Sequence, residues 1–309
     1  MNRQTYHANG KLLLTAEYFI LDGAVGLALP TKLGQTLTLT PSHKKGIQWK
    51  SLDNENNLWL DVDFDEHIEI ITSSNNEIAK TLKHILHKLQ IVNPKLQITT
   101  KLDFPNNWGL GSSSTLISLL AQWMKVNPYE LLAKTFGGSG YDIACATADG
   151  AITYQLQKTQ HLLRDNATPN NHQISNINFQ PSFTNHLYFL HLNKKQNSRE
   201  GILHYKNLTI NKLSIIEQLT ALTSKIIHAI DLDEFCYYLE VHENIISETL
   251  GLTKVKELYF SDFPGTVKSL GAWGGDFVLV ASDEHPEMIK QYFNSKGFST
   301  LISYNKMIL

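Results

Sequence analysis

Glycine and hydroxyl residues are concentrated in one short stretch, Gly109–Thr115, which reads Gly-Leu-Gly-Ser-Ser-Ser-Thr. Glycine lets a backbone approach an anion closely, and serine and threonine hydroxyls add hydrogen-bond donors. The residues before it, Leu96–Phe104, predict a strand, and the apolar residues after it, Leu116–Met124, predict a helix. A helix N-terminus carries unpaired N–H groups and a partial positive charge. The stretch therefore predicts a phosphate-binding loop at a strand-to-helix junction.

This loop matches neither of two common nucleotide-binding patterns. The chain has no Gly-x-x-x-x-Gly-Lys-Ser/Thr, and Gly109-Leu-Gly111 would need a third glycine at Ser114 to form a dinucleotide fingerprint. The simpler alternative is a helix start capped by serine, which is common. Four consecutive hydroxyl residues favour phosphate binding over that alternative.

Three further candidates for chemistry lie far from this loop. Lys11 follows a glycine ahead of an apolar run, Asp142 follows Gly-Ser-Gly-Tyr, and Gly271–Asp276 reads Gly-Ala-Trp-Gly-Gly-Asp. Taken alone, each has an ordinary interpretation. They are a solvated lysine at a strand end, an aspartate that satisfies N–H groups at a helix start, and a hairpin turn.

Together the four motifs closely resemble those of the GHMP kinases, the superfamily of galactokinase, homoserine kinase, mevalonate kinase and phosphomevalonate kinase. Pro105–Ser114 is similar to the second signature, Pro-x3-Gly-Leu-Gly-Ser-Ser followed by small residues. Gly10–Gly23 resembles the first motif and Gly271–Asp276 the third. Gly138–Ala144 resembles the segment that carries the catalytic aspartate in mevalonate and phosphomevalonate kinases.

Two positions depart from the family pattern, because Ala16 and Trp273 stand where it usually has glycine. A bulky side chain at position 273 would change how the third motif meets a substrate or phosphate. Tyr18 stands where mevalonate kinases usually have histidine, and phosphomevalonate kinases are similar to this sequence there.

The resemblance implies transfer of the γ-phosphate of ATP with the help of Mg²⁺. Asp142 would accept the proton of the attacking hydroxyl, and Lys11 would lie beside it and keep it ionised. Ser113 aligns with the serine that binds Mg²⁺, whereas the second metal ligand stays open, because Glu130 is not at the family's spacing from Asp142. The implied ATP-binding residues are Asn107, Gly109, Leu110, Gly111, Ser112, Ser113, Ser114 and Thr115. The implied substrate-binding residues are Glu17, Tyr18, Gly140, Lys194, Ser198, Gly271, Ala272, Gly274 and Gly275.

The acceptor is expected to be a hydroxyl or phosphate of a mevalonate-like small molecule. The motif details favour the mevalonate and phosphomevalonate branch over the sugar kinases but do not separate its two members. Lys194 and Ser198 lie in a stretch with three cations that could hold a carboxylate or phosphate, and a solvated loop is the alternative there. Two other functions stay open, a GHMP-fold decarboxylase of the diphosphomevalonate type and a non-catalytic ATP-binding protein of this fold.

Strands and helices alternate along the chain in a way that predicts an α+β protein. The predicted strands in the first quarter are Gly34–Thr40, Ile47–Lys50, Leu58–Val62 and Ile68–Thr72, and a helix follows at Glu77–Ile91. The second half predicts two long helices, Leu213–Ile230 and Asp233–Leu250, and then a strand, a glycine turn and a strand over Val267–Ala281.

The polar, Asn-rich stretch Gln157–Phe183 predicts a boundary between two domains, residues 1–183 and 184–309. The resemblance implies the two-domain GHMP kinase fold. Its N-terminal domain is like ribosomal protein S5 domain 2 and its C-terminal domain is ferredoxin-like. ATP and substrate are expected in the cleft between the domains.

Composition bounds the remaining possibilities. The 309 residues are 42% hydrophobic and carry a net charge of −2, which gives no electrostatic case for binding nucleic acid or an anionic membrane surface. No apolar run is long enough to span a membrane, and the two cysteines form no CxxC pattern. His84 and His87 share a helix face but lack an evident third metal ligand. We expect a cytoplasmic monomer or homodimer that acts on a small molecule.

Overall fold

The computed structural model describes residues 2–92, 94–157 and 172–309, which fall into two units. Unit one comprises Met1–Gly10, Leu33–Asn106 and Leu110–Thr147, and unit two comprises Lys11–Lys32, Asn107–Gly109 and Ala148–Leu309. The single domain boundary after residue 183 stays a prediction. Most of the polar stretch that suggested it, residues 158–171, lies outside the described residues.

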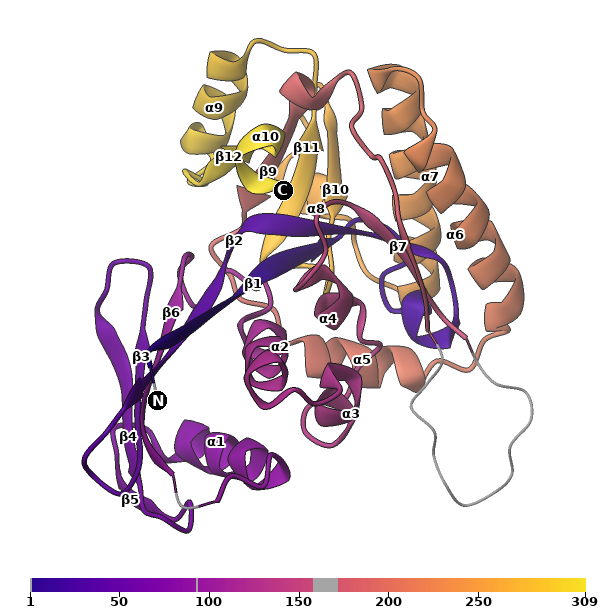
Figure 1. The fold of residues 1–309 in the computed structure, drawn as a ribbon. Helices are drawn as coiled ribbons and strands as arrows, with labels where there is room; N and C mark the ends of the chain where they lie inside the picture. The colour runs from indigo at the N-terminus through magenta and orange to yellow at the C-terminus, as the bar shows by residue number, and fades with distance from the viewer. Residues whose placement is uncertain (1, 93, 158–171) are drawn as a thin grey trace. The chain divides into compact units, whose positions relative to one another are not determined.

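Unit one contains strands in the order β5–β4–β3–β6–β2 (Figure 1). They are β3 (Gly46–Leu52), β4 (Leu58–Phe64), β5 (Ile70–Ser73), β6 (Lys95–Leu102) and residues 35–41 of β2 (Gly26–Pro41). β3 and β6 pair in parallel, which requires a long connection between them. β4, β5 and α1 (Asn76–Lys88) provide that connection. The strands predicted in the first quarter are confirmed, although β2 begins earlier than expected.

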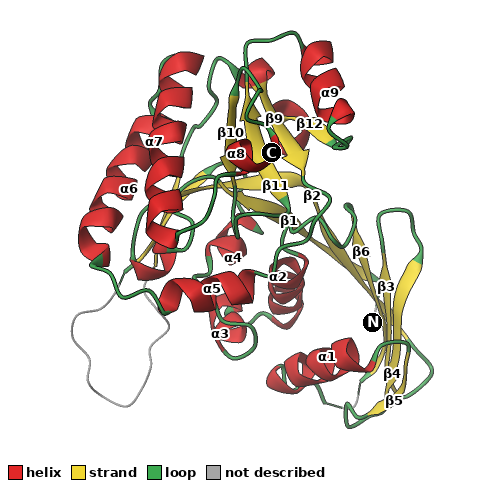
Figure 2. Ribbon diagram, turned by 180° about the vertical axis from the view of Figure 1, so that it is seen from behind, coloured by secondary structure: helices red, strands yellow, loops and turns green. Residues whose placement is uncertain are grey.

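Helix α1 packs against this sheet because its apolar residues recur at helical spacing (Figures 1 and 2). Leu82, Ile85 and Leu86 are buried in one cluster with Trp49 of β3. Asn75 caps the helix start, where its side chain accepts a hydrogen bond from the backbone of Ile78 at 3.2 Å. Burying each large aliphatic side chain contributes about 2 kcal/mol, so the cluster fixes α1 on the sheet.

Three helices complete unit one, α2 (Ser112–Met124), α3 (Pro128–Ala133) and α4 (Tyr141–Cys145). Asn127 caps α3 and Pro128 occupies its first turn, as the sequence predicts. α2 packs against both α3 and α4, and its buried face includes Ile117 and Leu120. The loop after β6 therefore leads into a helix that is held firmly in place.

Unit two contains a four-stranded antiparallel sheet in the order β10–β11–β9–β12. The strands are β9 (Leu187–His191), β10 (Thr266–Ser269), β11 (Phe277–Ala281) and β12 (Leu301–Ser303). Helices lie between β9 and β10 and between β11 and β12, which gives the βαββαβ order of a ferredoxin-like domain. This confirms the predicted architecture of the C-terminal part.

The long helices of unit two are α6 (Lys212–Ile227) and α7 (Leu232–Leu250), which lie side by side (Figure 2). The shorter ones are α5 (Ser198–Lys206), α8 (Val255–Tyr259), α9 (Pro286–Ser295) and α10 (Tyr304–Met307). This unit also contains residues 11–13 of β1 (Gln4–Leu13), the start of β2, β7 (Ile152–Leu156) and β8 (His172–Asn176). None of the described helices is long and apolar enough to cross a membrane.

The solvated loop considered as an alternative after β9 covers only part of this segment, because α5 begins at Ser198. Asn197 caps this helix by accepting a hydrogen bond from the backbone of Arg199 at 3.1 Å. Glu200 lies in its first turn and accepts a hydrogen bond from the Asn197 side chain at 2.7 Å. An N-cap residue followed three positions later by glutamate is a helix-start signal that the sequence contained.

Candidate functional site

The four hydroxyl residues at the start of α2 divide into two pairs. Ser114 Oγ donates to the carbonyl of Gly111 at 2.8 Å, Thr115 Oγ1 donates to Gln35 Oε1 at 2.7 Å, and both side chains are buried. Ser113 is exposed and Ser112 is partly exposed. Gly111 is the N-cap, at φ 94°, and has no side chain to cap the first turn. The open N–H groups of this turn and the two outer hydroxyls form a concentrated set of donors for an anion.

The beginning of the same loop lies in unit two, where it meets Lys11. Lys11 Nζ donates to the carbonyl of Gly109 at 2.9 Å. Gly109 has φ 67°, and a Cβ built on it would lie 2.2 Å from Cγ of Asp276. Glycine is therefore required here both by the backbone conformation and by the close approach of a carboxylate.

Asp276 is the central acidic residue of this part of unit two, and it was not among the predicted site residues. Its backbone N–H donates to the carbonyl of Lys194 at 2.6 Å, and its Oδ1 accepts from the backbone of Gln196 at 3.3 Å. Burial raises the pKa of its carboxyl, while the charge of Lys11 and the bond from Gln196 act in the opposite direction. The sequence offered a signal for it, because Asp276 ends the third motif.

The third motif forms the predicted turn between β10 and β11, and the structure shows where its unusual tryptophan goes. Trp273 has φ 56°, and its side chain is only 2% exposed, in a cluster with Ala16 and Tyr205. Tyr18 belongs to that cluster as well, and its hydroxyl donates to the carbonyl of Ala272 at 2.7 Å. The indole is therefore a core residue of unit two and does not extend from the turn into solvent.

The remaining glycines of the turn differ in the space around them. Gly271 and Gly274 have left-handed φ angles of 58° and 74°, and a built Cβ would meet nothing within 4 Å. At Gly275 a Cβ would lie 2.9 Å from both the Lys194 carbonyl and the Gln196 side chain. The turn thus packs tightly against the segment after β9, where Lys194 is exposed. Ser198 is also exposed, at the start of α5.

Glu17 has a different environment from that expected of a ligand-binding residue. Its side chain is fully buried and forms an ion pair with Lys268, which is fully buried too. A direct contact between Glu17 and a substrate stays a prediction that this burial does not support. The side chain of Leu110 is also fully buried, so only its backbone is left for the predicted ATP contact, and Asn107 is exposed.

Asp142 lies in unit one, on α4, which packs against α2. Its Oδ1 accepts a hydrogen bond from the backbone of Ile143 at 3.1 Å, and Gly140 caps the helix at φ 89°. Burial raises the pKa of the Tyr129 phenol, and the charge of Asp142 adds to that effect. Unit one therefore brings the helix of Asp142 against the helix that starts at the phosphate loop.

The described residues provide few further metal ligands. Glu130 is exposed and pairs with Lys134 at 3.7 Å. Within residues 2–92, 94–157 and 172–309, no group of three or more histidine, cysteine, aspartate or glutamate side chains is placed to hold a metal ion. The roles predicted for Lys11, Ser113 and Asp142 stay predictions.

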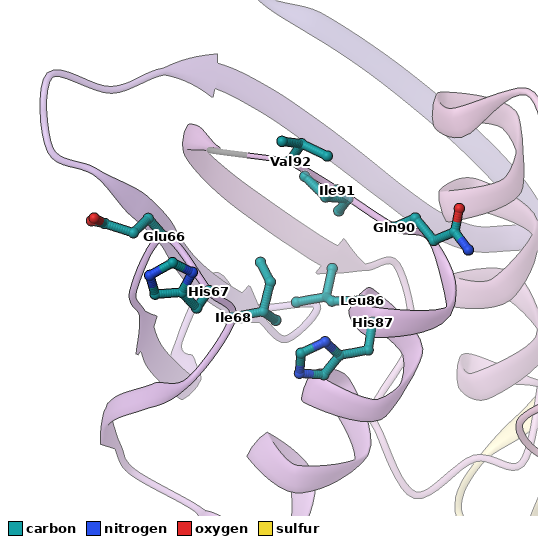
Figure 3. A pocket seen from close by; sticks show the side chains of 8 residues that line it. All are labelled: Glu66, His67, Ile68, Leu86, His87, Gln90, Ile91 and Val92. Carbon is teal, nitrogen blue, oxygen red and sulfur yellow. The ribbon is translucent and has the colours of Figure 1, made fainter.

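A pocket of about 220 Å³ lies elsewhere in unit one, between the end of α1 and the turn before β5 (Figure 3). Ile68, Leu86 and Ile91 supply its apolar wall, and the rings of His67 and His87 lie at its edge. It contains none of the predicted site residues and no metal-binding group among the described side chains.

Comparison with solved structures identifies the fold. Mevalonate kinase from L. major, solved with R-mevalonate, has a TM-score of 0.68 and 14% sequence identity, over 99% of this chain and 95% of its own. Phosphomevalonate kinase from Streptococcus pneumoniae, solved with phosphomevalonate and AMPPNP, has a TM-score of 0.67 and 18% identity, over 97% and 99% of the two chains. Galactokinase from Lactococcus lactis, solved with galactose, has a TM-score of 0.66 and 13% identity, over 97% and 92%.

The chain therefore has the two-domain GHMP kinase fold, as the motifs predicted. No protein-family model matches the chain, and no curated protein sequence matches it. At 13–18% identity the shared fold does not identify the reaction or the substrate.

Proposed function

We propose that this protein is an ATP-dependent small-molecule kinase that phosphorylates a hydroxyl or phosphate of a mevalonate-like acceptor. The observation that carries the proposal is the loop Gly109–Thr115. Its helix start combines an uncapped first turn with the outward hydroxyls of Ser112 and Ser113, and Lys11 donates to its first carbonyl. Such an array of N–H, hydroxyl and ammonium donors suits the phosphates of a nucleotide.

Phosphoryl transfer depends mainly on positioning and charge stabilisation. In the proposed reaction the loop N–H groups and the hydroxyls of Ser112 and Ser113 bind phosphate oxygens. Lys11 neutralises charge that develops during transfer, and Asp142 takes the proton of the attacking hydroxyl. When bound, Mg²⁺ would neutralise phosphate charge. The exposed hydroxyl of Ser113 fits it, because Mg²⁺ takes few protein ligands and keeps waters and phosphate oxygens.

The acceptor is proposed from the motif details and the chemistry of exposed residues near the third motif. The first motif and the Gly-Ser-Gly-Tyr-Asp segment resemble those of mevalonate and phosphomevalonate kinases. Lys194 and Ser198 would bind a carboxylate or phosphate of the acceptor, and both are exposed in the segment that follows β9. Solved proteins of this fold act on or bind mevalonate, phosphomevalonate and galactose, so the acceptor has to be measured.

The test is an acceptor panel with Mg-ATP in which ADP and CO₂ are both followed. Mevalonate, phosphomevalonate, diphosphomevalonate, homoserine and sugars are incubated with the wild type and with Asp142→Asn, Lys11→Met and Asp283→Asn. Asp283 is an exposed aspartate in unit two outside the predicted site, so it gives a matched control. We expect ADP with mevalonate or phosphomevalonate, a loss of at least about 100-fold in Asp142→Asn because general-base catalysis contributes that much, and no change in Asp283→Asn.

The other outcomes separate the alternatives. CO₂ released from diphosphomevalonate would identify a decarboxylase, and ATP binding without ADP from any acceptor would identify a non-catalytic binding protein. Near-normal turnover in purified Asp142→Asn would overturn the assignment of the base.

A further inference from the structure

A buried group of ionisable residues lies behind the first motif and is not used by the proposed reaction. Glu17, His242 and Lys268 are fully buried, and Glu243 is 3% exposed. Lys268 Nζ pairs with Glu17 Oε1, donates to the carbonyl of Ser269 at 2.9 Å and lies 3.7 Å from Glu243 Oε2. We call Glu17, His242, Glu243 and Lys268 the buried cluster.

Stability alone does not explain this buried cluster. Taking two carboxylates and one ammonium out of water is costly, and a buried ion pair contributes little net stability compared with apolar side chains of the same size. Within the described chain, Glu17 Oε2, His242 Nδ1, Glu243 Oε2 and Ser269 Oγ are buried without a hydrogen-bond partner. We therefore ask which backbone segments the buried cluster holds in place.

Three consecutive residues of the first motif are each held by a different element of unit two. The Ala16 N–H donates to His242 Nε2 on α7 at 2.9 Å, and the Glu17 carboxylate pairs with Lys268 on β10. The Tyr18 hydroxyl donates to the Ala272 carbonyl of the glycine turn at 2.7 Å. Because His242 Nε2 accepts a hydrogen bond, the imidazole is neutral with its proton on Nδ1, and burial, reinforced by the charge of Lys268, lowers its pKa well below the usual value.

The backbone held in this way is strained. Ala16 and Tyr18 have φ angles of 63° and 60°, in the left-handed region that favours glycine. The Tyr18 hydroxyl is also tightly enclosed, since a Cβ on Gly201 of α5 would lie 2.1 Å from it. Such a conformation persists only when surrounding contacts impose it. Here those contacts come from the buried cluster on one side and from the glycine turn on the other.

We propose that Glu17 and Lys268 are positioning residues for the phosphotransfer proposed above, on which this inference rests. Their ion pair fixes the turn at residues 16–18 and thereby keeps the Tyr18 hydroxyl on the Ala272 carbonyl. Lys268 also lies on β10, only three residues before Gly271. The buried cluster thus joins the segment that carries Lys11 to the turn that ends at Asp276, the carboxylate against Gly109.

The kinetic test compares Lys268→Met, Tyr18→Phe, their double variant and Tyr205→Phe. Tyr205 belongs to the same apolar cluster, but its hydroxyl donates to Asp22, so Tyr205→Phe removes a buried hydroxyl that does not touch the glycine turn. Tyr18→Phe removes the hydrogen bond that holds the turn, so we expect a three- to tenfold lower kcat, roughly the rate equivalent of one net hydrogen bond. We expect at least a tenfold lower kcat in Lys268→Met and no further loss in the double variant. The ATP affinity of every variant and the kcat of Tyr205→Phe should stay within about threefold of the wild-type values, which is less than the effect of losing one hydrogen bond.

A second measurement does not depend on activity. Amide hydrogen exchange in the folded proteins should be faster at residues 271–275 in Lys268→Met and in Tyr18→Phe, and unchanged there in Tyr205→Phe. If Lys268→Met does not fold, Glu17→Gln with Lys268→Met removes the pair without leaving a charged Glu17 unpaired, and the same acceleration is expected.

Normal exchange at residues 271–275 in a folded variant that lacks the pair overturns the positioning role. Additive losses of kcat in the double variant overturn it as well. Absence of ADP from the wild type with every acceptor would refute the proposed kinase only, because the exchange measurement still decides whether the buried cluster holds the turn.

Discussion

Replacing Gly109 by alanine tests whether the phosphate loop requires a residue without a side chain where it meets Asp276. The left-handed φ of 67° costs an alanine roughly 1–2 kcal/mol relative to glycine. The new Cβ would lie 2.2–2.5 Å from the carboxylate of Asp276, which Gln196 helps to hold through its backbone N–H. Overpacking of this kind costs about 1–3 kcal/mol, so we expect a total loss of about 3 kcal/mol in the free energy of unfolding.

Gly137→Ala provides the matched control for this substitution. Gly137 has φ 69°, almost the same as Gly109, but a built Cβ meets nothing within 4 Å. It should therefore lose only the conformational contribution of roughly 1–2 kcal/mol. Urea unfolding of both variants measures the difference. Equal losses would refute the reasoning, and adding Asp276→Ala to Gly109→Ala should recover the part of the loss that comes from the clash.

Two further predictions concern buried residues of unit two. Burial raises the pKa of Glu17 from 4.5 to about 7 in the folded protein. The folded state therefore binds this proton more tightly than the unfolded state, and the resulting stabilisation is complete below pH 4.5 and is lost as the pH rises through 7. The stability of the wild type minus that of Glu17→Gln should therefore fall by about 3 kcal/mol between pH 4.5 and 7.5, and a constant difference would contradict the shift. His242 contributes in the opposite direction in both proteins, and because its Nε2 lies 3.5 Å from Glu17 Oε2, the difference between the proteins includes the change in this interaction. Trp273→Gly relieves a left-handed φ but leaves a cavity where the indole is buried. We expect a net loss of about 3 kcal/mol in the free energy of unfolding, measured with urea. A gain in stability would show that the indole is not packed in the core.

Local patterns in the sequence were sufficient to predict most of the fold. The apolar residues of α1 recur at helical spacing, and Asn127 with Pro128 marks the start of α3. The motif glycines were informative for a physical reason, because Gly109 and Gly111 adopt backbone angles that other residues rarely reach. Features that depend on the local chain were therefore accessible before the structure was known.

Features that depend on distant partners were not accessible. Glu17 was expected to bind substrate because of the family resemblance, but it is fully buried and its partner Lys268 is 251 residues away. At the start of α2, Ser114 donates to a carbonyl three residues earlier, as helix geometry allows, whereas Thr115 donates to Gln35, 80 residues away. The contact of Ser114 could have been predicted from the spacing alone, whereas the partners of Thr115 and Glu17 could not.

Ala16 and Trp273 show that two turns of this chain adopt left-handed backbone angles without glycine. Both residues have left-handed φ angles, 63° and 56°, and both side chains lie in the cluster that contains Tyr18 and Tyr205. At Trp273 the strain of roughly 1–2 kcal/mol is offset by burial of the indole, which contributes more than that. At Ala16 the hydrogen bond from its N–H to His242 Nε2 helps to hold the strained backbone. Because both side chains lie in the core, neither of these residues bears on the choice of an acceptor. If the proposed reaction is correct, we expect residues that are exposed near the turn, such as Lys194, to select the acceptor.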